Sequence, residues 1–433
     1  MANREILDKL YAQVANDEDA RTCRDISEEA CREVPGNFFR IITANALTKI
    51  GDLLINPKTV LAWLVTAVGA PAWLAGFLVP IRESGSLIPQ LMIGALVRRH
   101  PVRKGFWVLG SALQGLAVLG MALAVWWLEG MQAGMAIIAL LILFSISRGF
   151  CSVAMKDVQG KCIPKSRRGR LTGLSATLSG AITFALSLII FQGEGDPTRA
   201  FYTALLTGAG MAWLLAAWVF FTVDEAPGAS EGGHNAFRQA LTSLGLLKTD
   251  RPFRRFVMTR ALLMSSSLAS PFLVLLAQDQ SSLPLLLGSF VLASSLASTV
   301  SATVWGYMAD TSSRNVMIRG GGLAAFVCML AGGFALWGPT VSWLHWLFPV
   351  AYFVLAIAHA GIRIGRKTYL VDMAGGTKRT DYTSVSNTVI GVLLLAVGGL
   401  SAVVSTFGND WALLVLGVMG AVGVLSAMLL EEV

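Results

Sequence analysis

The sequence predicts an all-α membrane protein with about twelve transmembrane helices, arranged as two parallel-related six-helix bundles. Composition is the first reason, because 55% of the 433 residues are hydrophobic and only 14% are charged, against roughly 25% charged in a soluble domain. The second reason is that the apolar residues form runs of about 20, the length a helix needs to cross the hydrocarbon. A transmembrane barrel would instead show alternating segments of about 10 residues.

Twelve apolar segments of helix length can be placed along the chain, and Pro57 predicts a kink in the first. They cover residues 38–66, 72–97, 105–128, 133–157, 171–192, 200–223, 254–277, 284–307, 315–337, 341–366, 382–407 and 411–430. The predicted organisation is an N-terminal segment (1–37), a first bundle (38–223), a linker (224–253) and a second bundle (254–433). The polar segment and the Pro- and Gly-containing linker are both expected in the cytoplasm.

The distribution of lysine and arginine predicts cytoplasmic N- and C-termini. With this orientation, 28 of the 34 Lys and Arg residues fall in cytoplasmic segments, and only Arg199 lies plainly outside. Cytoplasmic loops of membrane proteins carry such an excess, so the net charge of +8 indicates topology rather than nucleic-acid binding. Residues 1–36 are polar and acidic and show no signal peptide. The expected location is the plasma membrane, specifically a bacterial inner membrane, as a multi-pass protein in the lipid bilayer.

An internal repeat relates the two halves. A shift of 211 residues aligns RGRLTGLSATLSG (168–180) with RTDYTSVSNTVIG (379–391), matching Arg168 to Arg379 and Ser175 to Ser386. Nearly the same shift places Gly76 on Gly288. Both halves keep one orientation, which predicts a parallel duplication about an axis along the membrane normal.

The loop after the eighth segment carries glycine, aspartate and arginine at a recognisable spacing, in the residues Gly306, Asp310 and Arg314. It resembles the signature loop of the major facilitator superfamily. The first half has Gly94 in the equivalent position, but Arg98 replaces the expected aspartate. The resemblance implies the major facilitator fold, a monomer, and gating loops at Gly94, Gly306, Asp310 and Arg314. It also implies that spans 1, 4, 7 and 10 line a cavity, while spans 3, 6, 9 and 12 face outward.

Several charged and polar side chains lie within the predicted spans, where an ionisable group costs about 2.5–3.5 kcal/mol. On the first span Asn45, Lys49 and Asp52 share one helical face, because they are spaced by four and three residues. On the second, Glu83 and Gln90 follow one stripe, and Arg82 points about 100° away. The candidate substrate- and proton-binding residues are Asn45, Lys49, Asp52, Arg82, Glu83, Gln90, Arg148 and His359.

Each charged candidate also has a structural alternative. Lys49 and Asp52 can form an ion pair that fixes the first span, and Glu83 is either a proton carrier or a partner of Arg82. Arg148 is either a partner at the binding site or a packing anchor, and His359 is either a proton relay or a histidine that packs between helices.

The expected function is secondary active transport of a small anionic or zwitterionic organic solute, coupled to protons, by alternating access. Neither a P-loop nor a catalytic constellation is found in the sequence, so we expect no enzyme, no cofactor and no metal site. Two alternatives remain open. One is a facilitator or exchanger that needs no proton, and the other is an assembly or regulatory factor with a transporter-like fold that does not transport.

Overall fold

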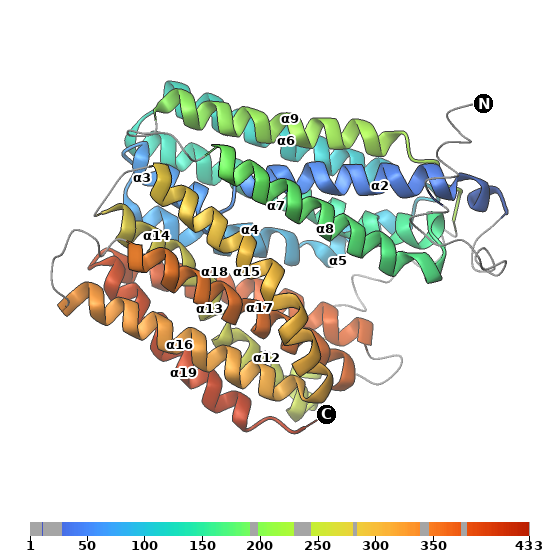
Figure 1. Cartoon of the computed structure of the whole chain (residues 1–433). Helices are drawn as coiled ribbons and strands as arrows, with labels where there is room; N and C mark the ends of the chain where they lie inside the picture. Colours follow the sequence, from blue (N-terminus) through green and yellow to red (C-terminus); the bar gives the residue numbers. More distant parts are fainter. Residues whose placement is uncertain are drawn as a thin grey trace.

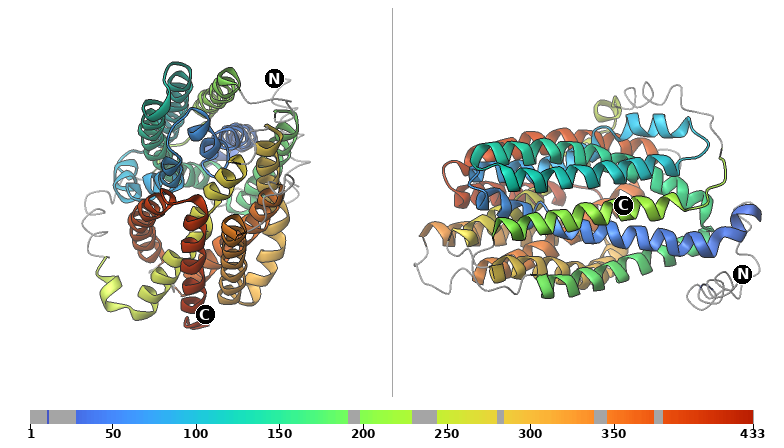
Figure 2. Two further views of the ribbon diagram at one scale, coloured as in Figure 1. Left: turned by 90° about the vertical axis from the view of Figure 1, so that its left-hand side faces the viewer. Right: turned by 90° about the horizontal axis from the view of Figure 1, so that it is seen from above.

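The computed structural model describes residues 11, 28–190, 198–228, 244–279, 284–337, 346–373 and 379–432, and every element in these ranges is a helix. The long helices run side by side in two groups, one from α2 to α9 and the other from α12 to α19 (Figure 1). A view along the helix axes separates the blue-to-green group from the yellow-to-red group (Figure 2, left). The predicted two-bundle, all-α membrane fold is therefore confirmed.

The first bundle contains one helix or a pair of shorter helices for each predicted span. Its elements are α2 (Glu28–Leu54), α3 (Val60–Ala67), the 3-10 helix η1 (Ala72–Leu74), α4 (Ala75–Leu87), α5 (Gln90–Arg98), α6 (Lys104–Trp127), α7 (Gly130–Cys162), α8 (Lys165–Ile190) and α9 (Arg199–Phe221). The helix of the first span begins ten residues before the predicted start at residue 38, so it includes part of the segment expected to precede the bundle.

The second bundle repeats this order after the short α11 (Leu246–Thr249). Its elements are α12 (Arg251–Leu263), α13 (Ser265–Leu268), α14 (Ser270–Gln278), α15 (Pro284–Thr311), α16 (Ser313–Trp337), α17 (Leu347–Met373), α18 (Arg379–Ser405) and α19 (Asn409–Met428). The helix of the tenth span ends seven residues beyond the predicted end at residue 366, which places Arg363 and Arg366 inside a long helix. The start predicted at residue 341 lies outside the described residues.

Nine spans in the described residues are long and apolar enough to cross a membrane. They correspond to all predicted spans except the first, second and eighth. In the first span α2 is long enough at 27 residues but too polar, the second is divided into α4 and α5, and the apolar part of the eighth, Leu285–Ser301, is below the full length. The outward sides of α6, α9, α16 and α19 expose large apolar side chains, as expected for spans 3, 6, 9 and 12 in contact with lipid. Examples are Leu116, Trp218, Phe326 and Leu425.

The first span is interrupted between α2 and α3, so the predicted kink at Pro57 is a complete break. Proline has no N–H and its ring clashes with the preceding turn. The Asn56 side-chain oxygen accepts a hydrogen bond from the Lys58 N–H at 2.9 Å, which closes a tight turn. Lys58 therefore lies at the helix break in the interior of the span.

The seventh span is interrupted at the equivalent place. The break between α2 and α3 covers residues 55–59, and adding the repeat shift of 211 gives 266–270, which contains most of α13 and its junction with α14 at Ala269. Three consecutive serines compete for backbone hydrogen bonds here, and Pro271 near the start of α14 removes another donor. The shared position of the two breaks supports the parallel repeat.

Helices α4 and α18 join the two bundles, with α8 and α15 forming a second seam. Three glycines bring α4 and α18 close together. A Cβ atom on Gly398 would lie 2.1 Å from the Pro80 ring, and one on Gly76 would lie 2.9 Å from Ala402. The buried Ser84 hydroxyl donates to the Gly391 carbonyl across this seam at 2.7 Å. The seam thus brings the two helix backbones into close contact at these glycines.

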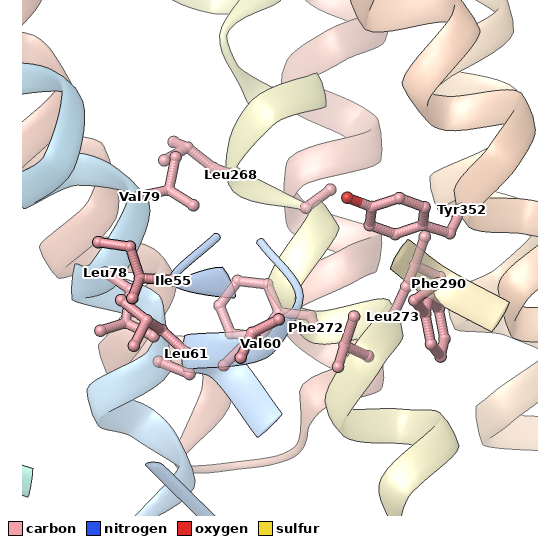
Figure 3. Close-up of a cluster of buried hydrophobic side chains, with 14 of the residues drawn as sticks. Ile55, Val60, Leu61, Leu78, Val79, Leu268, Phe272, Leu273, Phe290 and Tyr352 are labelled. Carbon is pink, nitrogen blue, oxygen red and sulfur yellow. The ribbon is translucent and has the colours of Figure 1, made fainter. Parts of the chain in front are cut away.

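The two ends of the bundles differ in packing. We call the end that carries Lys104, Lys161, Arg251 and Arg314 the basic face, and the end where α3 and α14 finish the far face. Toward the far face, apolar side chains from both bundles form one buried cluster (Figure 3). Its labelled members, which we call the far-face cluster, are Ile55, Val60, Leu61, Leu78, Val79, Leu268, Phe272, Leu273, Phe290 and Tyr352.

Candidate functional site

Asp52 lies at the centre of an ion-pair network contributed by three helices of the first bundle. Its carboxylate binds Arg82 of α4 at 2.5 Å and Arg148 of α7 at 2.8 Å, with Lys49 of α2 at 3.9 Å. The Arg82 guanidinium also lies 4.4 Å from the Phe144 ring centroid, a cation–π contact. The structure therefore brings four of the predicted site residues together.

Exposure rises steadily across this network. The side chain of Arg82 is 7% exposed, that of Asp52 19%, that of Arg148 37% and that of Lys49 58%. One carboxylate faces three cations, so the network keeps a surplus of positive charge on its solvent-accessible side. Two guanidinium groups within 3 Å stabilise the ionised carboxylate of Asp52.

Glu83 differs from Asp52, although it follows Arg82 directly in sequence. Its side chain is exposed, and in the described part of the chain its carboxylate has neither a hydrogen bond nor an ion pair. Arg82 binds Asp52 and does not bind Glu83. Glu83 nevertheless lies within electrostatic range of Lys58, Arg82, Arg148 and Arg366.

His359 is the predicted site residue that the second bundle contributes. Its Nδ1 atom is 3.0 Å from the Ser266 hydroxyl, in the broken seventh span. Lys58, Arg363 and Arg366 lie within electrostatic range of the imidazole. The helix break in the first bundle and the middle of α17 in the second therefore face one another across the interface.

Asn45 and Gln90 make longer contacts at the edge of this region. The Asn45 amide donates to Ser175 of α8 at 3.5 Å, within the first bundle. Gln90 accepts from Asn387 of α18 at 3.5 Å, across the two bundles. Asn387 also accepts from Arg260 at 3.0 Å, and Arg260 donates to Ser386 at 2.6 Å.

The gating-loop residues lie at the basic face. Arg314 binds Glu432 at 3.0 Å and donates to the Leu430 carbonyl at 2.9 Å, which attaches the end of the chain to the start of α16. Gly94 and Gly306 have open space where a Cβ would lie, so packing does not demand glycine there in this state. The side chains of Arg98 and Asp310 lie outside the described residues.

Four cations near this site were not among the predicted site residues: Lys58, Arg260, Arg363 and Arg366. Arg363 and Arg366 were counted with the 28 cytoplasmic Lys and Arg residues. A signal was present in α17, because Tyr352, His359 and Arg366 are spaced by seven residues and thus share a helix face. Arg366 was not selected because it stands at the predicted end of the tenth span, where basic residues mark the cytoplasmic side.

At the far face, side-chain contacts join the two bundles. The Thr66 hydroxyl hydrogen-bonds the Gln278 side chain, and Gln278 donates to the Trp63 carbonyl at 3.2 Å, which joins α3 to α14. The same two helices contribute to the far-face cluster, with Val60 and Leu61 from α3 and Phe272 and Leu273 from α14 (Figure 3). In contrast, Lys49, Glu83 and Arg363 are exposed. The charged region is therefore partly exposed, and toward the far face the two bundles meet in apolar and hydrogen-bonded contacts.

Two six-helix bundles with charged side chains gathered at their interface define a multi-pass secondary transporter of small molecules. The chain belongs to the Major Facilitator Superfamily, whose family model matches residues 41–343. A comparison with curated protein sequences finds no match.

Solved transporter structures share the fold. The D-xylose–proton symporter has a TM-score of 0.70 at 13% identity, covering 91% of this chain and 97% of that chain. The inward-open xylose transporter XylE from E. coli has a TM-score of 0.67 at 13% identity, covering 92% and 97%. A POT family transporter in complex with 5-aminolevulinic acid has a TM-score of 0.68 at 12% identity, covering 90% and 94%. At these identities the likeness concerns the fold alone.

Proposed function

We propose that this protein is a proton-coupled transporter of a small anionic or zwitterionic organic solute and works by alternating access. The observation that carries the proposal is the cluster of charged side chains between the two bundles, three of which, Lys49, Glu83 and Arg363, are exposed. Charges are expensive at this depth, and a site between the bundles is where transporters of this architecture expose a solute alternately to each side.

The charges at the interface are strongly unequal in number. In the described residues, seven cationic side chains accompany two carboxylates, Asp52 and Glu83. We call this set the central cluster, and its cations are Lys49, Lys58, Arg82, Arg148, Arg260, Arg363 and Arg366. A positive surplus favours a solute that brings negative charge to the site.

The two carboxylates are suited to different roles. Asp52 is held between Arg82 and Arg148, so its role is to neutralise them and to position Arg148 beside the site. Glu83 has an accessible carboxylate without a fixed partner, which suits a group that takes up and releases a proton during transport. We therefore assign proton coupling chiefly to Glu83.

The proposal places the basic face, with both chain termini, in the cytoplasm, and the protein as a monomer in a bacterial inner membrane. The lysine and arginine distribution supports this orientation. The state described here is then open to the cytoplasm, and the outward-open state requires Thr66 and Gln278 to separate. The α4–α18 seam supports the rocking of one bundle against the other, because its glycines allow close backbone contact between the two helices.

The test is transport into proteoliposomes of a solute selected by a thermal-shift screen of a metabolite library. We expect uptake driven by a pH gradient in the unmodified protein. The variant E83Q keeps solute counterflow but loses the pH-driven component, and D52N reduces both. If both variants keep full pH-driven transport, the proton assignment is wrong.

The same assays separate the alternatives. Counterflow that ignores the pH gradient in the unmodified protein indicates a facilitator or exchanger. Failure of every solute to stabilise the protein, together with copurification of one partner complex, indicates an assembly factor.

A further inference from the structure

We infer that Lys58 and Arg366, from opposite bundles, bind a doubly charged oxyanion group of the solute, either a phosphate monoester or a pair of carboxylates. Glu83 is the protonatable group beside that anion. This inference deepens the proposed function by assigning the solute class and the residues that hold it, and it rests on that function only for the statement that the bound anion is transported.

The helix break positions Lys58 for this role. A lysine inside a continuous span would have to reach toward the membrane surface to meet water. Lys58 instead follows the turn closed by Asn56, where the chain leaves α2 before entering α3. Its ammonium lies within electrostatic range of Glu83 in its own bundle and of Arg363 and Arg366 in the other.

The second observation is that these groups have no protein partner. In the described ranges, none of Lys58, Glu83, Arg363 and Arg366 has a side-chain hydrogen bond or an ion pair within 4.0 Å. The other cations of the central cluster are partnered, as in the bonds from Arg82 to Asp52 and from Arg260 to Ser386. Lys58 and Arg366 are only partly exposed, so leaving their charges unpaired is costly, and a bound anion is the partner that would offset this cost.

The chemistry of the cations indicates the type of anion. A guanidinium presents a planar fork that matches two oxygens of a carboxylate or phosphate, while an ammonium acts as a compact point charge. Arg366 and Lys58 together suit a group with at least two anionic oxygens and two charges. A zwitterion fits less well, because its own cation would lie among Lys58, Arg363 and Arg366.

An anion at this position also couples the two bundles. Lys58 repels Arg363 and Arg366 across the interface when the site is empty, because all three are positive. A doubly charged anion between them replaces that repulsion with attraction from both sides. Binding therefore favours approach of the bundles on the open side, which closure around the solute requires.

Proton and anion binding are linked through Glu83. The charged groups that face Glu83 are Lys58, Arg82, Arg148 and Arg366. An anion bound among them is repelled by the Glu83 carboxylate, and a proton on Glu83 removes that repulsion. A proton on Glu83 therefore strengthens anion binding.

The experiment measures binding without transport, by thermal unfolding of the full-length protein in detergent. Ribose 5-phosphate is compared with ribose, and succinate with its neutral analogue succinamide. We expect at least one anion to stabilise the protein while its neutral analogue does not. K58Q and R366Q should each weaken that anion's apparent affinity at least about tenfold, whereas R199Q, on an exposed far-face arginine paired with Glu129, should leave it unchanged.

Two further arms keep the test decisive. The charge-retaining variants K58R and R366K should restore most of the affinity if charge is what matters, and unfolding without ligand shows whether K58Q and R366Q are folded. Anion affinity of the unmodified protein should be higher at pH 6.5 than at pH 8.0. The change in anion affinity between these two pH values should be smaller in E83Q than in the unmodified protein. Because both proteins are measured with the same anions, titration of the anions themselves cancels.

If only ribose 5-phosphate stabilises the protein, the solute is a phosphate monoester. If only succinate does, the solute is a dicarboxylate. The inference is overturned if neither anion stabilises the protein, if the neutral analogues act equally, or if K58Q and R366Q bind like the unmodified protein. Unchanged pH dependence in E83Q overturns the role of Glu83. Since no transport is measured, these failures are distinguishable from failure of the proposed function, which requires loss of solute movement in proteoliposomes.

Discussion

Arg103 and Arg314 are separated by the repeat shift of 211 residues, and each binds a carboxylate that follows the last helix of its own bundle. The backbone N–H of Arg103 donates to Glu225 at 2.9 Å, just after α9, and the Arg314 guanidinium binds Glu432 at 3.0 Å, just after α19. Arg103 also pairs with Asp157 of α7 at 3.1 Å. In both bundles, the segment that follows the last helix is thus bound to the start of the third span.

Substitution of Glu225 tests the first of these attachments. Its side chain is 0% exposed and accepts from the N–H groups of Arg103 and Lys104 and from the Lys161 ammonium. Because such charge-assisted bonds contribute about 1.5–3 kcal/mol, E225Q should lower the free energy of unfolding by about 2 kcal/mol in a denaturant titration. E432Q is the matched control. That carboxylate is 53% exposed, and its loss should cost less than about 1 kcal/mol. Equal effects would contradict this assignment.

Loss of Asp52 should destabilise the first bundle. D52N leaves Arg82, with only 7% of its side chain exposed, without its counter-charge, and removing one partner of a buried ion pair typically costs about 3–5 kcal/mol. We expect a large fall in the thermal midpoint, partly restored in the double variant D52N/R82Q. K49Q should have little effect, since Lys49 is 58% exposed. A midpoint unchanged in D52N would show that the network does not stabilise the fold.

Cross-linking the far face should arrest transport. Thr66 and Gln278 are hydrogen-bonded across α3 and α14, so cysteines at both positions should be joined by a short bis-methanethiosulfonate cross-linker, in which each cysteine forms a reducible disulfide bond. In the proposed cycle, that cross-link holds the far face closed and prevents its opening. Uptake should fall to background and recover on reduction. The single variants T66C and Q278C, tested in the same way, control for the native cysteines. Full uptake in the cross-linked protein would contradict a moving far face.

Two neighbouring glycines give a matched test of the α4–α18 seam. A Cβ on Gly398 would lie 2.1 Å from the Pro80 ring, whereas a Cβ on Gly399 would meet its nearest atom, on Phe77, at 3.8 Å. G398A should destabilise the protein by about 1–3 kcal/mol, as expected for overpacking. G399A should be neutral or slightly stabilising, because alanine favours the helix. The comparison uses unfolding midpoints, and similar values for both variants would show that the seam relaxes freely.

The fold was predictable because the length and apolar composition of membrane helices can be recognised in the sequence. Each of the twelve spans corresponds to helical structure, and the repeat read from Arg168 and Arg379 agrees with the breaks in the first and seventh spans. Helix ends were predicted less well, since the polar start of α2 and the basic end of α17 carry no apolar signal. The apolar pattern marks where the helix meets lipid, and a helix extends beyond that region wherever protein or water surrounds it.

The network around Asp52 was partly predictable from spacing, because Lys49 and Asp52 share a helix face. The partners supplied by α4 and α7 depend on how three helices pack, which spacing along one helix does not reveal. Lys58 was not among the predicted site residues for a different reason. Its depth depends on the chain stopping at Pro57 and turning in the interior, and the sequence indicated only a kink. The roles of these residues remain predictions.

The far-face cluster also determines where the membrane voltage acts. Water and ions that reach Lys49 and Glu83 from the basic face bring that solution's potential into the protein. The electric field is then concentrated across the thin apolar layer that includes Ile55 and Phe272, and does not spread over the full thickness. A unit charge crossing this layer experiences about 2.3 kcal/mol per 100 mV. A net-charged transport step should therefore draw most of its voltage dependence from the opening and passage of this layer.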